Sequence, residues 1–204
     1  MMADIYSSIG MIAGIIEFLG FLPYILNTIS RKVTPNKATW IIWSVVGIII
    51  AASYYASGAR DTVWMPIASA IGIVLVALLS LKYGEEGWSA LDKTCLIGAG
   101  AGLALWWYTN EPALAYGMTT MVDAIGALPT IKKAYDRPDS ERNLAWPMFF
   151  IASTLNLIAI REWTFVIALY PAYVFVLNSS MSALVFIPGR AGKTKKPGKG
   201  SAAR

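Results

Sequence analysis

The stretch that decides the fold, EFLGFLP at residues 17–23, has a counterpart 106 residues later, DAIGALP at residues 123–129. Each copy has an acidic residue followed by glycine, leucine and proline at the same spacing, and a tryptophan 17 residues after the proline. Five matched positions without a gap indicate an internal duplication. The paired acids and tryptophans are Glu17 and Asp123, and Trp40 and Trp146.

The composition is typical of a membrane protein. Hydrophobic residues make up 56% of the chain and charged residues 14%, with a mean hydropathy of +0.55. The apolar residues form long runs rather than the period-two alternation of transmembrane strands, and a transmembrane helix needs about 20 apolar residues. The sequence therefore predicts an all-α membrane protein with seven transmembrane helices. The seven runs lie near Tyr6–Ile29, Ala38–Ser57, Val63–Lys82, Asp92–Thr109, Pro112–Ala134, Leu144–Ile160 and Trp163–Ile187.

The distribution of basic residues predicts the orientation. The first apolar run has no basic residue before it and is too long for the apolar core of a signal peptide, so we expect a permanent helix. With the N-terminus outside, 15 of the 17 lysines and arginines face the cytoplasm, in three loops and the C-terminal tail. We expect a multi-pass protein of a plasma or inner membrane with a cytoplasmic C-terminus. The basic residues assigned to the loop between the fifth and sixth runs are Lys132, Lys133, Arg137 and Arg142.

Several function classes are disfavoured by composition. The net charge of +5 comes mainly from the tail, residues 188–204, which we expect to be disordered and to contact anionic lipid headgroups rather than nucleic acid. Cys95 is the sole cysteine and histidine is absent, so we expect neither a disulfide, a metal nor a cofactor. An enzyme is disfavoured because a serine or cysteine nucleophile has no evident base.

The duplication predicts the domain organisation. A single transmembrane domain, residues 1–187, contains two three-helix repeats, 6–83 and 112–187, joined by a linker helix, 92–109. Because three is odd, the extra crossing gives both repeats the same orientation, as parallel repeats about an axis along the membrane normal. Small residues offer faces for close packing in the linker and in the first helix. They are Gly98, Gly100 and Gly102, and Gly10 and Gly14.

Prolines at matched positions suggest hinges. Pro23 and Pro129 lie inside the first helix of each repeat, and Pro147 lies near the start of the sixth helix. An internal proline removes a backbone hydrogen bond and kinks a helix. Matched kinks would let the two repeats rock about a central site. The alternative is that these prolines are simply tolerated in membrane helices.

A three-helix unit with Gly-x-Leu-Pro in its first helix, a basic loop and a tryptophan at the start of the next helix resembles the PQ-loop superfamily. Two such units joined by a linker helix, with the N-terminus outside, resemble the seven-helix sugar transporters called SWEETs. Tyr24 and Thr130 stand where the Pro-Gln pair has its glutamine. The resemblance covers residues 6–187 and implies alternating access. Related vitamin-precursor transporters, amino-acid exporters and a retention-signal receptor share the plan.

Buried polar residues are the candidates for the site. A carboxylate at mid-bilayer costs at least about 2.5–3.5 kcal/mol, so we expect Glu17 and Asp123 to face a central cavity and bind solute or protons. The alternative is that each is protonated and hydrogen-bonds a neighbouring helix. Asn156 and Asn178 carry amides suited to a hydroxyl-rich solute, and the resemblance implies an asparagine in the seventh helix.

The tryptophans and the outer loops complete the candidates. The eight tryptophans lie near predicted helix ends, as in an aromatic belt, and Trp43, the deepest, is the one most suited to a pocket. Arg60 and Asp61 in one outer loop, and Arg161 and Glu162 in the other, either pair as a latch between the repeats or remain solvated.

Taken together, the residues predict a transporter that moves a small polar solute, with a sugar as the first candidate. A proton-coupled amino-acid or vitamin-precursor transporter is the nearest alternative, and a ligand-binding receptor of the same fold is the alternative of another class. The sequence leaves a homo-oligomer open.

Overall fold

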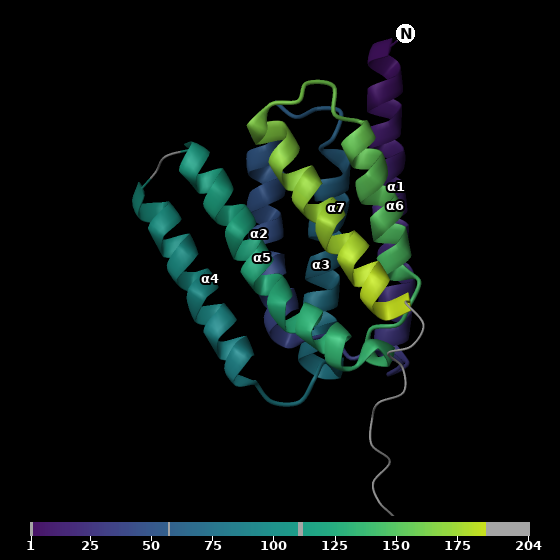
Figure 1. Cartoon of the computed structure of the whole chain (residues 1–204), viewed down its shortest axis with the longest axis vertical. Helices are drawn as coiled ribbons and strands as arrows, with labels where there is room; N and C mark the ends of the chain where they lie inside the picture. Colours follow the sequence, from purple (N-terminus) through teal and green to yellow (C-terminus); the bar gives the residue numbers. More distant parts are fainter. Residues whose placement is uncertain (1, 57, 110–111, 187–204) are drawn as a thin grey trace, which may run out of the picture.

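A computed structural model describes residues 2–56, 58–109 and 112–186, so the whole tail, residues 188–204, lies outside the described residues. Within these ranges the chain is all-helical and has no strand, which confirms the predicted secondary structure class (Figure 1). The seven α-helices are α1 (Met2–Ile29), α2 (Lys37–Ala56), α3 (Trp64–Tyr83), α4 (Ala90–Thr109), α5 (Pro112–Asp136), α6 (Ala145–Ile158) and α7 (Phe165–Phe186), and a short 3-10 helix, η1, covers Pro138–Ser140.

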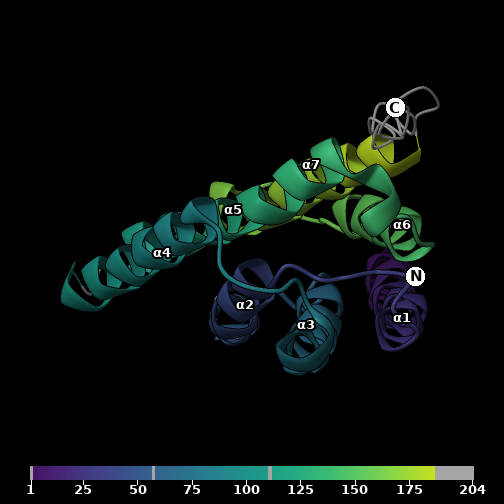
Figure 2. The same cartoon turned by 90° about the horizontal axis from the view of Figure 1, so that it is seen from below.

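The helices form two rows. Figure 2 shows α2, α3 and α1 in one row, and α4, α5, α7 and α6 in the other. Within the first repeat α1 and α2 both pack on α3, and within the second α5 and α6 both pack on α7. The third helix therefore lies in the middle of each repeat.

The two repeats contact each other through equivalent pairs of helices. The first helix of each repeat packs on the second helix of the other, so that α1 packs on α6 and α5 packs on α2. Helix α4 packs on α5 and, less extensively, on α2. The equivalent pairs are the arrangement expected for two parallel repeats about a central axis.

Two matched glycines make this contact close. A Cβ atom on Gly20 would lie 2.7 Å from the ring of Phe149 and 3.3 Å from Cβ of Met148. A Cβ atom on Gly126 would lie 2.6 Å from Ile42 and 3.5 Å from the ring of Trp43. Residues 148 and 149 are the counterparts of 42 and 43 under the same offset of 106. The duplicated glycine is therefore explained by packing between the repeats.

The other glycines differ from one another in their packing. Gly10 and Gly14 of α1 do lie against neighbouring backbone, at Asp61 and Trp64 respectively. In the linker, Gly98 has only an ordinary contact, and a Cβ atom on Gly100 would meet no atom within 4 Å. The expectation of close packing is confirmed for α1 and wrong for these two linker glycines, because α4 lies at the edge of the bundle.

The helices expose large apolar side chains, and some polar side chains are buried among the apolar residues of the core. Three helices are long and apolar enough to cross a membrane, α1 from Ile5, α3 and α7, and this indicates membrane association. The apolar parts of α2 and α6 are shorter, and the 14 residues of α6 extend only about 21 Å. Each of the seven helices nevertheless exposes a large apolar side chain, for example Leu26, Val45, Leu78, Ile97, Leu128, Ile151 and Val176.

Two helix boundaries affect residues that were assigned from the sequence. Helix α5 continues to Asp136, so Lys132 and Lys133 lie in its last turns and not in a loop. Helix α6 begins at Ala145, so Pro147 is in its first turn. Backbone N–H groups in the first turn have no partner within the helix. Pro147 therefore removes no helical hydrogen bond, and the expected kink there has no cause.

Prolines do lie inside the helices where the matched kinks were predicted. Pro23 is internal to α1 and Pro129 is internal to α5. A further internal proline, Pro171 in α7, was not among the predicted hinges. Whether any of them acts as a hinge stays a prediction.

Candidate functional site

A central cavity lies between the two repeats. All six repeat helices line it, whereas none of its described lining residues comes from α4. The space that the centre of a water molecule can reach inside it is about 50 Å³. A single water needs about 10–15 Å³ of such space. The cavity in this conformation therefore has room for a few waters.

The two matched acids both line this cavity, as predicted from their position. Glu17 Oε1 accepts a hydrogen bond of 2.6 Å from Ser69 of α3, and Asp123 Oδ2 accepts one of 2.6 Å from Tyr173 of α7. Both carboxyl groups are buried. In each repeat, therefore, an acid on the first helix is held by a hydroxyl on the third.

One carboxylate oxygen remains without a partner. Glu17 Oε2 is buried and has no hydrogen bond to any of the described protein groups. An unpaired buried oxygen costs free energy that a bound ligand, water or proton would recover. Glu17 is therefore the part of the cavity wall best able to bind a hydrogen-bond donor or a positive charge.

Matched aromatic pairs form another part of the wall. Trp40 and Trp43 meet edge to face at 5.3 Å and 84°, and their counterparts Trp146 and Phe149 do so at 5.8 Å and 85°. All four line the cavity. The assignment of Trp40, Trp43 and Trp146 to an aromatic belt is thus wrong, because all three are buried in the core. Trp64, Trp88, Trp107 and Trp163 are exposed, as a belt requires.

Two further polar residues of the wall are already bonded to the protein. Trp43 Nε1 donates to the backbone carbonyl of Asp123 at 3.0 Å, which joins α2 to α5. Asn178 Nδ2 donates to the carbonyl of Phe149 at 3.1 Å. Both residues line the cavity, as predicted.

Asn156 does not belong to this cavity. It is fully buried in α6, but it does not line the space between the acids, and neither atom of its amide has a partner among the described residues. Asn156 lies seven residues beyond Phe149, on the same helix face but about 10.5 Å further along the axis. Asn156 therefore lies outside this cavity, and its predicted role in binding the solute stays a prediction.

The charge of the cavity wall is one-sided. Two carboxyl groups line it, and its described lining includes neither lysine nor arginine. Among the described residues, cysteine and acidic side chains form no group of three or more that could hold a metal ion. The wall can therefore bind a proton, a positive charge or hydrogen-bond donors.

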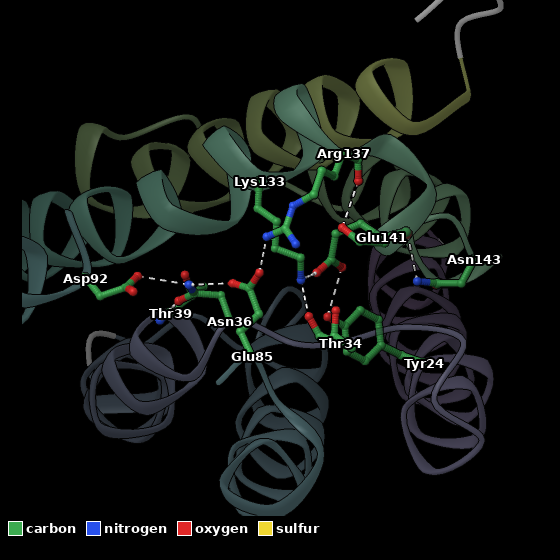
Figure 3. A network of polar contacts seen from close by, with 11 residues as sticks. Tyr24, Thr34, Asn36, Thr39, Glu85, Asp92, Lys133, Arg137, Glu141 and Asn143 are labelled. Carbon is green, nitrogen blue, oxygen red and sulfur yellow. Dashed lines mark hydrogen bonds and ion pairs between the residues drawn. The ribbon is translucent and has the colours of Figure 1, made fainter. Parts of the chain in front are cut away.

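A polar network joins the repeats at the end predicted to be cytoplasmic (Figure 3). Lys133 of α5 forms a buried ion pair with Glu141 at 2.5 Å and also donates to the backbone carbonyl of Thr34. Glu141 accepts a second hydrogen bond, of 2.9 Å, from Tyr24 of α1. Tyr24 and Thr34 belong to the first repeat and the ion pair to the second, so the network holds the two repeats together.

The same network extends to the linker helix. Asn36, just before α2, donates to Asp92 of α4 at 2.9 Å and to Glu85 at 3.2 Å, while Arg137 pairs with Glu85 (Figure 3). Asn36 also accepts a hydrogen bond of 3.0 Å from the backbone of Thr39. The segment before α2 and the segment after α3 are thus tied to α4 and to the second repeat, respectively.

Contacts also join the repeats at the opposite end. Arg161 Nη2 lies 2.8 Å from Asp61 Oδ2, which is one of the pairings considered for the outer loops. Arg60 lies instead over the ring of Tyr55, at 4.2 Å, and Glu162 borders the same surface hollow as Arg161. The latch function of this pair stays a prediction.

A buried tyrosine strengthens this outer contact. The hydroxyl of Tyr54 in α2 bonds the hydroxyl of Thr62 at 2.9 Å and donates to the carbonyl of Ile167 in α7 at 2.9 Å. Tyr54 therefore joins the two repeats at the end opposite Lys133. The sequence suggested Tyr54 as a residue of the outer vestibule, but it predicted neither the hydrogen-bond partners of Tyr54 nor the Lys133–Glu141 pair, because these partners lie far apart in the chain or across a loop.

A comparison of the chain with protein-family models, with curated proteins and with solved structures found no match. The function is therefore argued from the site itself.

Proposed function

We propose that this protein is a membrane transporter that moves a small polar solute by alternating access between its two three-helix repeats. The observation that carries the proposal is the central cavity, where Glu17 and Asp123 occupy equivalent places and Glu17 keeps an unpaired oxygen. Buried acids inside a membrane bundle typically mark substrate or proton pathways.

The proposal includes seven transmembrane helices with the N-terminus outside. Three helices satisfy length and composition alone, and the apolar side chains exposed on all seven support membrane contact by the whole bundle. Most of the described basic residues lie in or near the loops α1–α2, α3–α4 and α5–α6, and these loops lie at one end (Figure 1), as the positive-inside rule requires.

Alternating access is favoured by the contacts at the two ends. The Lys133–Glu141–Tyr24 network joins the repeats at one end, and the Arg161–Asp61 and Tyr54 contacts join them at the other. The cavity has room for only a few waters in this conformation, so we expect the repeats to move apart at one end to admit a solute. Transporters built from repeats move in this way around a fixed site.

The resemblance to SWEETs supports a sugar as cargo, and the pair of acids supports a positively charged or proton-coupled cargo. Both belong to the same transport class. The alternative is a receptor that binds the solute without transporting it. The same experiment distinguishes a receptor from a transporter.

The experiment is uptake of radiolabelled hexoses, basic amino acids and nicotinamide riboside into proteoliposomes, with and without a pH gradient. Glu17→Gln and Asp123→Asn should each reduce uptake at least tenfold, whereas Asp139→Asn, at an exposed position, should not. Undiminished uptake by both well-folded site variants would contradict the assigned site. Saturable binding without uptake would favour a receptor.

A further inference from the structure

The central cavity differs from a typical polyol site in the balance of its polar groups. Three of the donors on its wall are already used within the protein: Ser69 donates to Glu17, Trp43 to the carbonyl of Asp123, and Asn178 to the carbonyl of Phe149. The group left unpaired on the acids is an acceptor, Glu17 Oε2. A hydroxyl-rich solute needs both donors and acceptors, whereas a cation needs only the latter.

The apolar part of the wall also suits a cation. Six aromatic residues line the cavity, and a cation near an aromatic face is attracted by the ring quadrupole. The attraction by the aromatic rings adds to the attraction by the two carboxyl groups. The described lining contains no basic residue that would neutralise these carboxyl groups. The six are Phe21, Trp40, Trp43, Trp146, Phe149 and Tyr170.

Donors remain on two walls. The indole N–H groups of Trp40 and Trp146 are buried and have no partner among the described groups. They lie on α2 and α6, whereas the free carboxylate oxygen lies on α1, and all three residues line the same space. A cargo that carries a positive charge and also a hydroxyl or carbonyl oxygen would satisfy the carboxylate oxygen and an indole N–H.

We propose that the cavity selects a small monovalent organic cation, an amine or a quaternary ammonium with a hydroxyl or carbonyl group, bound between Glu17 and Asp123 and surrounded by the aromatic rings. This inference rests on the proposed transport function for its physiological meaning. The binding site itself can be tested without transport.

The test compares solutes that differ only in charge. Binding to the purified full-length protein in detergent is followed by tryptophan fluorescence, since Trp40, Trp43 and Trp146 line the cavity. Choline is compared with its uncharged isostere 3,3-dimethylbutan-1-ol, ethanolamine with propan-1-ol, and glucose serves as the polyol. At least one cation should bind tenfold or more tightly than its uncharged partner and than glucose.

Variants assign the effect to the site. Glu17→Gln should weaken binding of that cation at least tenfold, and Asp139→Asn, which removes an exposed carboxylate, should leave it unchanged. The comparison on the unmodified protein does not depend on the folding of any variant. The inference is overturned if neither cation binds more tightly than its uncharged partner, or if glucose binds as tightly as both.

Uptake into proteoliposomes separates the two proposals. Binding of a cation without uptake of any solute would support the cation site and overturn transport. Uptake of glucose with no preference for a cation would support transport and overturn the cation site. Uptake of the cation, driven by an inside-negative potential, would support both.

Discussion

At the scale of single residues, Gly20 and Gly126 determine how closely the repeats approach. Replacing either by alanine places a methyl group within 2.7 Å of a side chain of the other repeat. Overpacking a tight contact typically costs about 1–3 kcal/mol. We expect Gly20→Ala and Gly126→Ala each to lower the thermal unfolding midpoint in detergent and to reduce uptake.

The matched control is Gly100→Ala in α4, where an added methyl group meets no atom within 4 Å. Its midpoint should stay the same or rise, because alanine favours helix by about 1 kcal/mol over glycine. If the three variants unfolded alike, the glycines would not mark an interface between repeats.

The residues of the site were predictable to different degrees. Glu17 and Asp123 were identified because a repeated acid in an apolar run is informative by itself. Their partners Ser69 and Tyr173 were not identified. Which hydroxyl meets each acid depends on how the neighbouring helix is rotated about its axis, and composition does not reveal this rotation. Asn156 shows another limit, since the sequence placed it in the sixth helix but not relative to the cavity, which it does not line.

At the scale of helices, the buried Lys133–Glu141 pair stabilises the end of α5. Removing one partner leaves a buried charge without compensation, which typically costs about 3–5 kcal/mol. We expect Glu141→Gln to lower the unfolding midpoint strongly. Asp136→Asn, which breaks the exposed Lys132–Asp136 pair on the same helix, should cost less than about 1 kcal/mol.

The double variant Lys133→Met with Glu141→Leu removes both charges and tests the cause. It should be more stable than Glu141→Gln, because no charge is left buried. Equal losses for Glu141→Gln and Asp136→Asn would show that the buried pair does not support the closed end.

Helix ends were the least predictable part of the fold. The run that predicts α5 ends at Ala134, and its basic residues were assigned to the following loop, but basic residues favour the last turn of a helix, so α5 includes them and continues to Asp136. At α6 the side chain of Asn143 accepts a hydrogen bond of 2.7 Å from the backbone of Ala145, which starts the helix just before Pro147. Hydropathy does not detect either effect.

At the scale of the whole molecule, the proposed seven-span topology makes a direct prediction. The protein should remain in the membrane fraction after an alkaline carbonate wash, because every helix exposes large apolar side chains. A fluorescent reporter that folds only in the cytoplasm should be active at the C-terminus and inactive at the N-terminus. Release by carbonate would contradict an integral membrane protein, and equal reporter signals would contradict an odd number of spans.

The duplication was predictable from one offset, but the pairing of the repeats was not. The offset of 106 says which residues are equivalent. It does not say that α1 meets α6 and α5 meets α2, since this depends on which faces bury the glycines. The matched ring geometries of Trp40 with Trp43 and Trp146 with Phe149 became visible only in the folded chain.

One difference between the matched aromatic pairs has a consequence for the ligand. Trp43 donates a hydrogen bond to the backbone of Asp123, and its counterpart Phe149 has no N–H to offer Glu17. The cavity between the matched helices therefore has two chemically unequal halves. A molecule with two different ends would have one preferred orientation in the cavity, and would keep the same end toward the same repeat throughout a transport cycle.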